Sequence, residues 1–226
     1  MDIKFAFFHI EKCAGSSLRM MLFEYFRHLY DLRQIYIPEK YNVKQNLLNA
    51  RDLEILKPAG YKLLFCHCNF NQFNVTDSFS KTCFSITCVR EPLARFLSHY
   101  YFFGRNRTPF ANLTDEQIVP MLKDTSLLTR RLGGNTNNLT VALDNLKHIN
   151  CILILEQLES DVVSLNKLLN ETTGAALKFK MIFKNVHKSY SIEDYARITK
   201  FKQYFASDIK LYSVICDMSS DQRFKN

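Results

Sequence analysis

Residues 4–19 read KFAFFHIEKCAGSSLR, and this stretch decides the expected fold class. Residues 4–10 form an apolar run typical of a buried strand, and from Ser16 to about Tyr30 apolar residues recur at helical spacing. Residues 11–17, between the two, contain a lysine, a glycine and two serines. A helix N-terminus carries N–H groups without intrahelical partners and the positive end of the helix dipole. A strand–loop–helix of this composition therefore predicts a loop built around an anion.

Other apolar runs predict further strands. They are apolar on both alternating faces, as in a parallel sheet that is covered on both sides. These runs are residues 62–67, 83–89 and 151–156, with a shorter one at 35–38.

Helical patterns alternate with these strands, at residues 92–103 and 157–169. Near the end, Ser191 and Asp194 form a capping pattern before one long amphipathic helix, expected to run to about Ile215. Surface loops are expected at residues 104–114 and 130–138. The alternation predicts a three-layer α/β fold with a mainly parallel central sheet, in a single domain spanning residues 1–226.

Charge and cysteine content narrow the function classes. The 226 residues carry a formal net charge of +8, which favours anionic partners such as nucleotides, acidic glycans, nucleic acid or a membrane surface. No apolar run approaches the roughly 20 residues of a membrane helix, and the N-terminus has no signal-peptide cleavage site. Seven cysteines, mostly within apolar runs, indicate free thiols and a cytoplasmic location. Five N-x-S/T sequons point instead towards secretion; they are Asn74, Asn106, Asn112, Asn138 and Asn170.

A second stretch, TCVREPLARFLSHYYF at residues 87–102, has the same strand–turn–helix layout. Arg90 follows the strand, Pro92 suits a first helical turn, and Ser98 lies about 9 Å further along that helix. An arginine binds phosphate oxygens in a fork, and a serine hydroxyl can add one bond. Together the two stretches predict two separate anion sites, as a nucleotide with two phosphate groups needs.

These two motifs resemble those of the carbohydrate sulfotransferases. HIEKCAGSSL is similar to their H-I-P-K-T-x-G-[ST]-[ST] loop, and VREPLARFLSHYYF to their V-R-[DE]-P-x-x-R-x-x-S-x-Y-Y motif. The likeness is greatest to the heparan sulfate and uronyl 2-O-sulfotransferase branch. It implies 3′-phosphoadenosine 5′-phosphosulfate (PAPS) as the donor, and it implies an acidic saccharide or glycan acceptor rather than nucleic acid.

The resemblance also implies roles for individual residues. A P-loop-like strand–loop–helix would hold the phosphosulfate through Lys12, Ala14, Gly15, Ser16, Ser17 and Leu18. Arg90 and Ser98 would hold the 3′-phosphate. Two positions depart from the family pattern, because Glu11 stands where the family has proline and Cys13 where it has threonine.

A third segment, FCHCNFNQF at residues 65–73, resembles the H-G-H-V-S-[YF]-L-D-F segment of the 2-O-sulfotransferases. This likeness implies that His67 is the base that takes the acceptor proton, while Lys12 stabilises the leaving oxygen; no metal is required. Lys188 and Ser189, in the basic segment 184–190, are expected donor contacts. Arg130 and Arg131 are expected to meet donor or acceptor, and His9 is expected to be structural.

Two other functions remain open. Cys13 and Arg19 have the C-x5-R spacing of the small cysteine phosphatases, whose thiolate is activated at a helix N-terminus. The chain could also be a catalytically silent nucleotide-binding or glycan-binding module. A Walker A loop is disfavoured because Lys12 precedes the glycine, and zinc at Cys66, His67 and Cys68 is disfavoured because adjacent strand residues point to opposite faces.

Overall fold

The protein has a five-stranded sheet with the order β2-β3-β1-β4-β5, and every neighbouring pair is parallel. This computed structural model describes residues 5–31, 33, 35–36, 62–66, 70, 83–103, 108–134, 136–180 and 190–225. The strands are β1 (Phe5–Phe8), β2 (Ile35–Tyr36), β3 (Leu63–Cys66), β4 (Phe84–Val89) and β5 (Cys151–Ile154). The mainly parallel sheet predicted from the apolar runs is confirmed.

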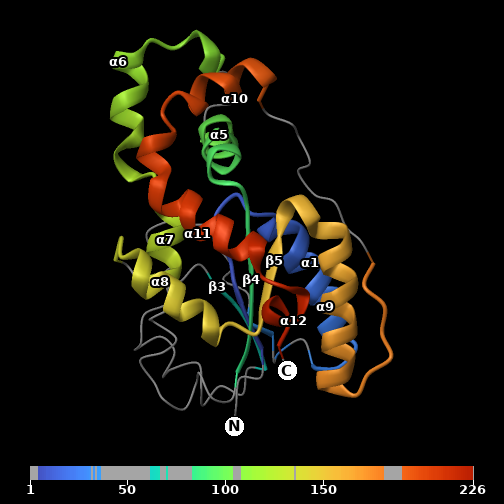
Figure 1. The fold of residues 1–226 in the computed structure, drawn as a ribbon. Helices are drawn as coiled ribbons and strands as arrows, with labels where there is room; N and C mark the ends of the chain where they lie inside the picture. Colours follow the sequence, from blue (N-terminus) through green and yellow to red (C-terminus); the bar gives the residue numbers. More distant parts are fainter. Residues whose placement is uncertain are drawn as a thin grey trace.

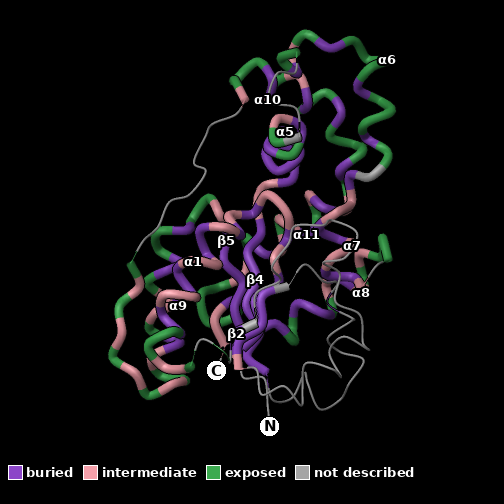
Figure 2. Tube along the Cα trace, turned by 180° about the vertical axis from the view of Figure 1, so that it is seen from behind, coloured by how far each residue is buried: buried purple, intermediate pink, exposed green. Residues whose placement is uncertain are grey.

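Helices cover both faces of this sheet (Figure 1). On one face lie α1 (Gly15–Phe26) and α9 (Leu158–Thr173), joined by the hydroxyl of Tyr25, which donates to Asn170 Oδ1 at 2.8 Å. On the other lie α7 (Leu127–Leu132), α8 (Leu139–Asn145) and α11 (Ala206–Asp217). All residues of β1, β4 and β5 are buried, as strands between two helical layers must be (Figure 2). The three-layer α/β fold is confirmed.

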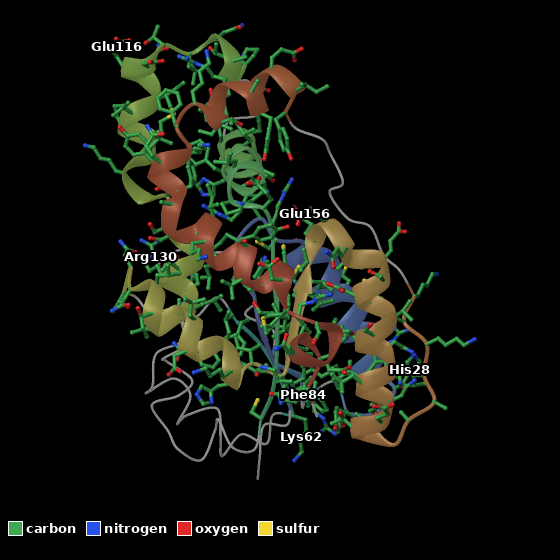
Figure 3. The ribbon with its side chains drawn as sticks, in the orientation of Figure 1. His28, Lys62, Phe84, Glu116, Arg130 and Glu156 are labelled. Atoms are coloured by element: carbon green, nitrogen blue, oxygen red, sulfur yellow. The ribbon has the colours of Figure 1, made fainter. Side chains whose placement is uncertain are left out.

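The strand order reverses at the centre of the sheet. From β1 the chain passes towards β2 on one side, whereas from β4 it passes to β5 on the other. The hydroxyl of Thr87 in β4 donates to the carbonyl of Phe8, the last residue of β1, at 3.0 Å. Figure 3 shows Lys62 and Phe84 at the amino ends of the strands and Glu156 at the opposite end. Ligands of open α/β sheets bind at the carboxyl ends beside such a switch point, here the ends of β1 and β4.

A second hydrophobic cluster lies beyond this carboxyl edge, around α5 (Pro92–Phe103) (Figures 1 and 2). Its other elements are the 3-10 segments η2 (Phe110–Asn112), η3 (Val119–Asp124) and η6 (Lys202–Phe205) and the helices α6 (Asp115–Ile118) and α10 (Ile192–Thr199). Phe110 is fully buried there, with its ring against Phe96 and Tyr100. The surface loop predicted at 104–114 is therefore only partly correct: most of residues 108–114 are exposed, but Phe110 and Leu113 are buried in the second cluster, and 104–107 lie outside the described residues.

The single long helix predicted after Ser191 is also wrong. The Ser191–Asp194 capping box is present, but the helix stops at Thr199, and η6 separates α10 from α11. The two halves serve different cores. Phe201 and Phe205 pack in the second cluster, whereas Leu211 and Ile215 of α11 pack in the main core beside the sheet. A straight helix could not serve both, so the chain bends between them.

Arg130 and Arg131 belong to the last turn of α7 and not to the expected loop at 130–138. The shorter connection that remains begins at Gly133, where a Cβ atom would lie 2.6 Å from the carbonyl oxygen of Thr129. Among the described helices, none combines the length and apolarity needed to cross a membrane.

Candidate anion-binding site

The loop between β1 and α1 has a strained backbone. The N–H of Cys13 donates to the carbonyl of Ile10 at 3.3 Å, which closes a tight turn. Lys12 and Ala14 have φ angles of 68° and 56°, and they are the non-glycine residues with positive φ in the described part of the chain. Cys13, between them, keeps a negative φ. Alternation of this kind is typical of backbone segments whose N–H groups bind anions, although the N–H of Cys13 is already bonded to Ile10.

The N-terminus of α1 receives no cap from its own side chains. Ala14 occupies the N-cap position, and the first turn holds no acidic residue. The first intrahelical bond runs from the N–H of Leu18 to the carbonyl of Ala14, at 3.0 Å. The N–H groups of residues 15–17 therefore precede the helical ladder and add to the positive end of the dipole.

Gly15 makes room for a side chain. A Cβ atom at this position would lie 1.7 Å from Nε2 of His9, so the imidazole ring occupies that space. The same ring lies nearly parallel to that of Phe7, with 6.1 Å between centroids. The packing fits the structural role expected of His9. It also gives Gly15 a role that the sequence did not indicate.

Arg90, after β4, joins the second loop to the first. Its Nη1 donates to the carbonyl of Lys12 at 3.3 Å, and its Nη2 donates to the hydroxyl of Tyr190 at 3.2 Å. Its Nε is buried without a hydrogen-bond partner. The arginine of one predicted anion site thus lies against the lysine of the other.

The Lys12 ammonium group lies 3.8 Å from the ring centroid of Phe102, which is 55% exposed near the end of α5. Burial, and then the charge of Arg90, lower the pKa of Lys12. Within the described residues, neither Lys12 nor Arg90 forms an ion pair with a carboxylate. The site therefore has two adjacent cations that an anion can neutralise.

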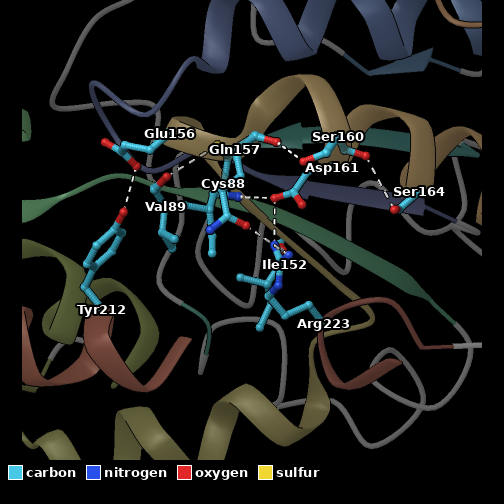
Figure 4. Close-up of polar contacts among 11 residues, drawn as sticks. Cys88, Val89, Ile152, Glu156, Gln157, Ser160, Asp161, Ser164, Tyr212 and Arg223 are labelled. Atoms are coloured by element: carbon cyan, nitrogen blue, oxygen red, sulfur yellow. Dashed lines mark hydrogen bonds and ion pairs between the residues drawn. The ribbon is translucent and has the colours of Figure 1, made fainter. Parts of the chain in front are cut away.

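Carboxylates line the neighbouring junctions. Glu91 accepts hydrogen bonds from the N–H groups of Leu93 and Ala94, at 3.1 and 2.6 Å, and so caps α5. Glu156, which follows β5, accepts from the N–H of Glu91 and, as Figure 4 shows, from the hydroxyl of Tyr212. Carboxylates therefore accept hydrogen bonds at these helix and strand ends, whereas α1 has no side-chain cap from Ala14 and no acidic residue in its first turn.

Figure 4 also shows how the start of α9 is held. Asp161, in the first turn of α9, accepts from the N–H of Ile154 and from Nη1 of Arg223, both at 2.7 Å. Its carboxylate ties the end of β5 to the helix that follows. The third strand–helix junction is therefore closed by a buried ion pair.

Cys13 is 1% exposed, and its thiol donates to the carbonyl of Glu11 at 3.7 Å. Burial raises the pKa of Cys13 to about 12. A nucleophilic cysteine needs the opposite shift, because the thiolate is the reactive form. Arg19, its partner in the C-x5-R spacing, is half-buried on α1.

The other predicted site residues differ in how deeply they are buried. Ser16 is half-buried at the start of α1, while Ser17, and Ser98 on α5, are buried. Leu18 does not fit a ligand contact, because its side chain is in the main core and its N–H bonds to Ala14. His67, Lys188 and Ser189 lie outside the described residues. In the described ranges, no three His, Cys, Asp or Glu side chains lie close enough together to hold a metal ion.

Several contacts were not expected from the sequence. The pairing of Arg131 with Glu11, the Tyr190 hydroxyl on Arg90 and the Phe102 ring under Lys12 join residues far apart in the chain. Of the contacts described above, only the Glu91 cap could have been recognised from the sequence, because an acidic residue directly precedes a proline that opens a helix. No protein-family model matches this sequence, and no curated protein matches it.

Proposed function

We propose that the protein is a PAPS-dependent sulfotransferase that transfers a sulfuryl group to a hydroxyl of a saccharide. The observation that carries this proposal is the 3.3 Å contact between Arg90 and the carbonyl of Lys12. It joins the two motifs that resemble the phosphosulfate and 3′-phosphate sites of the carbohydrate sulfotransferases. One nucleotide with anionic groups at both its 5′ and 3′ ends can span such a pair of cations.

The β1–α1 loop would hold the phosphosulfate in the manner of a P-loop. The N–H groups around the positive-φ residues Lys12 and Ala14 and at the start of α1 supply neutral donors, and Ser16 adds a hydroxyl. The Lys12 ammonium would move from the Phe102 ring to the bound anion. Arg90, with an unpartnered buried Nε, would take the 3′-phosphate together with Ser98.

The transfer is an in-line displacement. The acceptor oxygen bonds to sulfur while the bond from sulfur to the bridging phosphate oxygen breaks, which releases 3′-phosphoadenosine 5′-phosphate (PAP). Lys12 meets the charge that grows on the leaving oxygen, and the acceptor proton passes to His67. We assign His67 this role from its motif and from β3, which pairs with β1 and ends at the same edge of the sheet.

The acceptor and donor assignments follow from the resemblance and the net charge of +8, the cytoplasmic location from the cysteines, and the Golgi alternative from the resemblance. The acceptor is an acidic saccharide, Lys188 and Ser189 contact the donor, and the cytoplasm is the compartment, with the Golgi lumen as the alternative. Against the phosphatase alternative stands Cys13, since its burial and raised pKa oppose a thiolate nucleophile.

Calorimetry with PAP and with AMP tests the proposal. The 3′-phosphate should tighten binding by roughly ten- to a hundred-fold, the worth of about 1.5–3 kcal/mol for charge-assisted hydrogen bonds. Incubation with PAPS and a panel of saccharides should then give sulfated product. Equal binding of PAP and AMP would refute the nucleotide assignment. Tight PAP binding without transfer would favour a silent binding module, and hydrolysis of an aryl phosphate would favour the phosphatase.

A further inference from the structure

Glu11 places a carboxylate directly before Lys12, in a loop proposed to bind an anion. Its charge would oppose that anion, yet the side chain is already paired. Nη2 of Arg131 contacts Oε1 of Glu11, and Nε of Arg131 donates to Oε2 at 3.3 Å, so both carboxylate oxygens are engaged. The arginine side chain is 11% exposed and the glutamate 29%, so water screens this pair less than a surface pair.

The helix that carries Arg131 is fixed by hydrogen bonds to a neighbouring helix. Arg131 lies in the last turn of α7, a helix of six residues. Asp208 of α11, fully buried, accepts hydrogen bonds from the N–H groups of Leu128 and Thr129 at 2.9 and 2.7 Å, and from the Thr129 hydroxyl at 2.7 Å. The start of α7 is thereby fixed to α11, and the guanidinium group has a defined position.

The loop needs such support. Positive φ angles at residues such as Lys12 and Ala14 are unfavourable, and they persist only where the surroundings over-determine the backbone. Arg90 holds the carbonyl of Lys12, and the His9 ring packs on Gly15. Arg131 supplies a third restraint, from another helical layer. Of the three, it is the one that also cancels a negative charge.

We infer that Arg131 is a positioning residue of the anion site, which fixes the β1–α1 loop and neutralises Glu11. This inference rests on the proposed function only in that the loop binds the 5′ anionic group of the nucleotide. It assigns Arg131 to the protein's own carboxylate and not to donor or acceptor. Lysine could not replace it fully, because a single ammonium group cannot bind both carboxylate oxygens in a planar fork.

The test compares PAP affinity by calorimetry in Arg131→Met, Arg131→Lys and the double variant Glu11→Gln/Arg131→Met. Arg131→Met should weaken binding about tenfold, since it removes the positive charge that offsets the Glu11 carboxylate near the anion. Arg131→Lys should have an intermediate PAP affinity. The double variant should regain most of the lost affinity, because it also removes the negative charge of Glu11. Lys123→Met, which removes the same charge at an exposed position of η3 shortly before α7, is the matched control and should change affinity much less.

Hydrogen exchange of amides 12–17 in the ligand-free protein gives a second readout. Exchange should be faster in Arg131→Met and in the double variant than in the wild type, because both lose the restraint. The inference is overturned if Arg131→Met binds PAP like the wild type, if the double variant is no tighter than Arg131→Met, or if exchange is unchanged. If the wild type does not bind PAP, the proposed function fails, while the exchange measurement still decides for or against the restraint.

Discussion

The junctions β1–α1 and β4–α5 have the same plan and opposite chemistry. Each joins a buried central strand to a helix of 12 residues at the same edge of the sheet. In the second, Glu91 accepts the first free N–H groups of the helix, and the backbone is satisfied. In the first, Ala14 offers no side-chain cap, and the backbone around it has positive φ angles.

This difference teaches how each junction can recognise an anion. The first can use its backbone, because Ala14 gives no side-chain cap and the first turn of α1 holds no acidic residue to offset the helix dipole. The second cannot, since Glu91 occupies the corresponding place, so recognition there depends on the Arg90 side chain. In backbone recognition the binding energy is shared by several N–H groups, whereas in side-chain recognition most of it depends on one residue.

The largest effect should come from outside both junctions. If His67 only removes the acceptor proton, His67→Ala should lower turnover by about 10²–10⁴ and leave PAP affinity nearly unchanged. Turnover, PAP affinity and melting temperature are measured on one purified variant. Unchanged turnover, or a joint fall of affinity and melting temperature, would remove His67 from the chemical step.

Arg90→Ala should give the largest loss of nucleotide affinity. Because the second junction relies on this one side chain, PAP binding should fall by roughly ten- to a hundred-fold. AMP binding should fall less, since AMP lacks the 3′-phosphate that Arg90 is proposed to hold. Calorimetry with both nucleotides checks this expectation, and an equal loss for PAP and AMP would contradict the division between the junctions.

Ala14→Asp would make the first junction resemble the second. Aspartate tolerates the positive φ at this position and can accept from the N–H groups at the start of α1. The new carboxylate should compete with the bound anion and weaken PAP binding about tenfold, without lowering the melting temperature. Ala14→Asn, which caps without a charge, is the control. Unchanged PAP affinity in Ala14→Asp would mean that this helix start does not contact the nucleotide.

The sequence predicted the strands of the sheet more accurately than the segments around the sheet. Strands such as β4 are buried on both faces, so an unbroken apolar run identifies them locally. The meeting of the two loops depends on the strand order, which was not predicted from the sequence: β1 and β4 flank the switch point. The burial of Phe110 and the bend at Phe201 depend on distant segments that form the second cluster, and no local pattern encodes such partners.

Within the site, the same limit holds. Lys12, Gly15 and Arg90 stood out because their residue types suit anion binding in a strand–loop–helix. The partner of Glu11 is 120 residues away on a short helix, and the place of the His9 ring beside Gly15 follows from the turn geometry. Long-range pairing and side-chain packing leave no periodic signal, so these contacts required the structure.

A smaller effect should appear as a pH dependence of nucleotide binding. Burial and the charge of Arg90 lower the pKa of Lys12, and under the proposed function the protonated form binds the anion. PAP affinity should therefore fall as pH rises through this lowered pKa, earlier than for an ordinary lysine. Binding should in turn take up protons, which calorimetry detects as a heat that depends on the buffer. In Lys12→Met this pH limb should disappear, and its persistence would assign it to another group.

The smallest effect should come from Glu91→Ala, which opens the second junction. Loss of a cap costs about 0.5–2 kcal/mol of stability, roughly a few degrees of melting temperature for a chain of this size. PAP affinity should hold or rise slightly, because an uncapped α5 would present its positive end close to Arg90. Glu159→Ala, at an exposed acid in the first turn of α9, is the control and should lose less stability. If Glu91→Ala weakened PAP binding as much as Arg90→Ala, the cap would be part of the nucleotide site. The contrast between a backbone junction and a side-chain junction would then have to be given up.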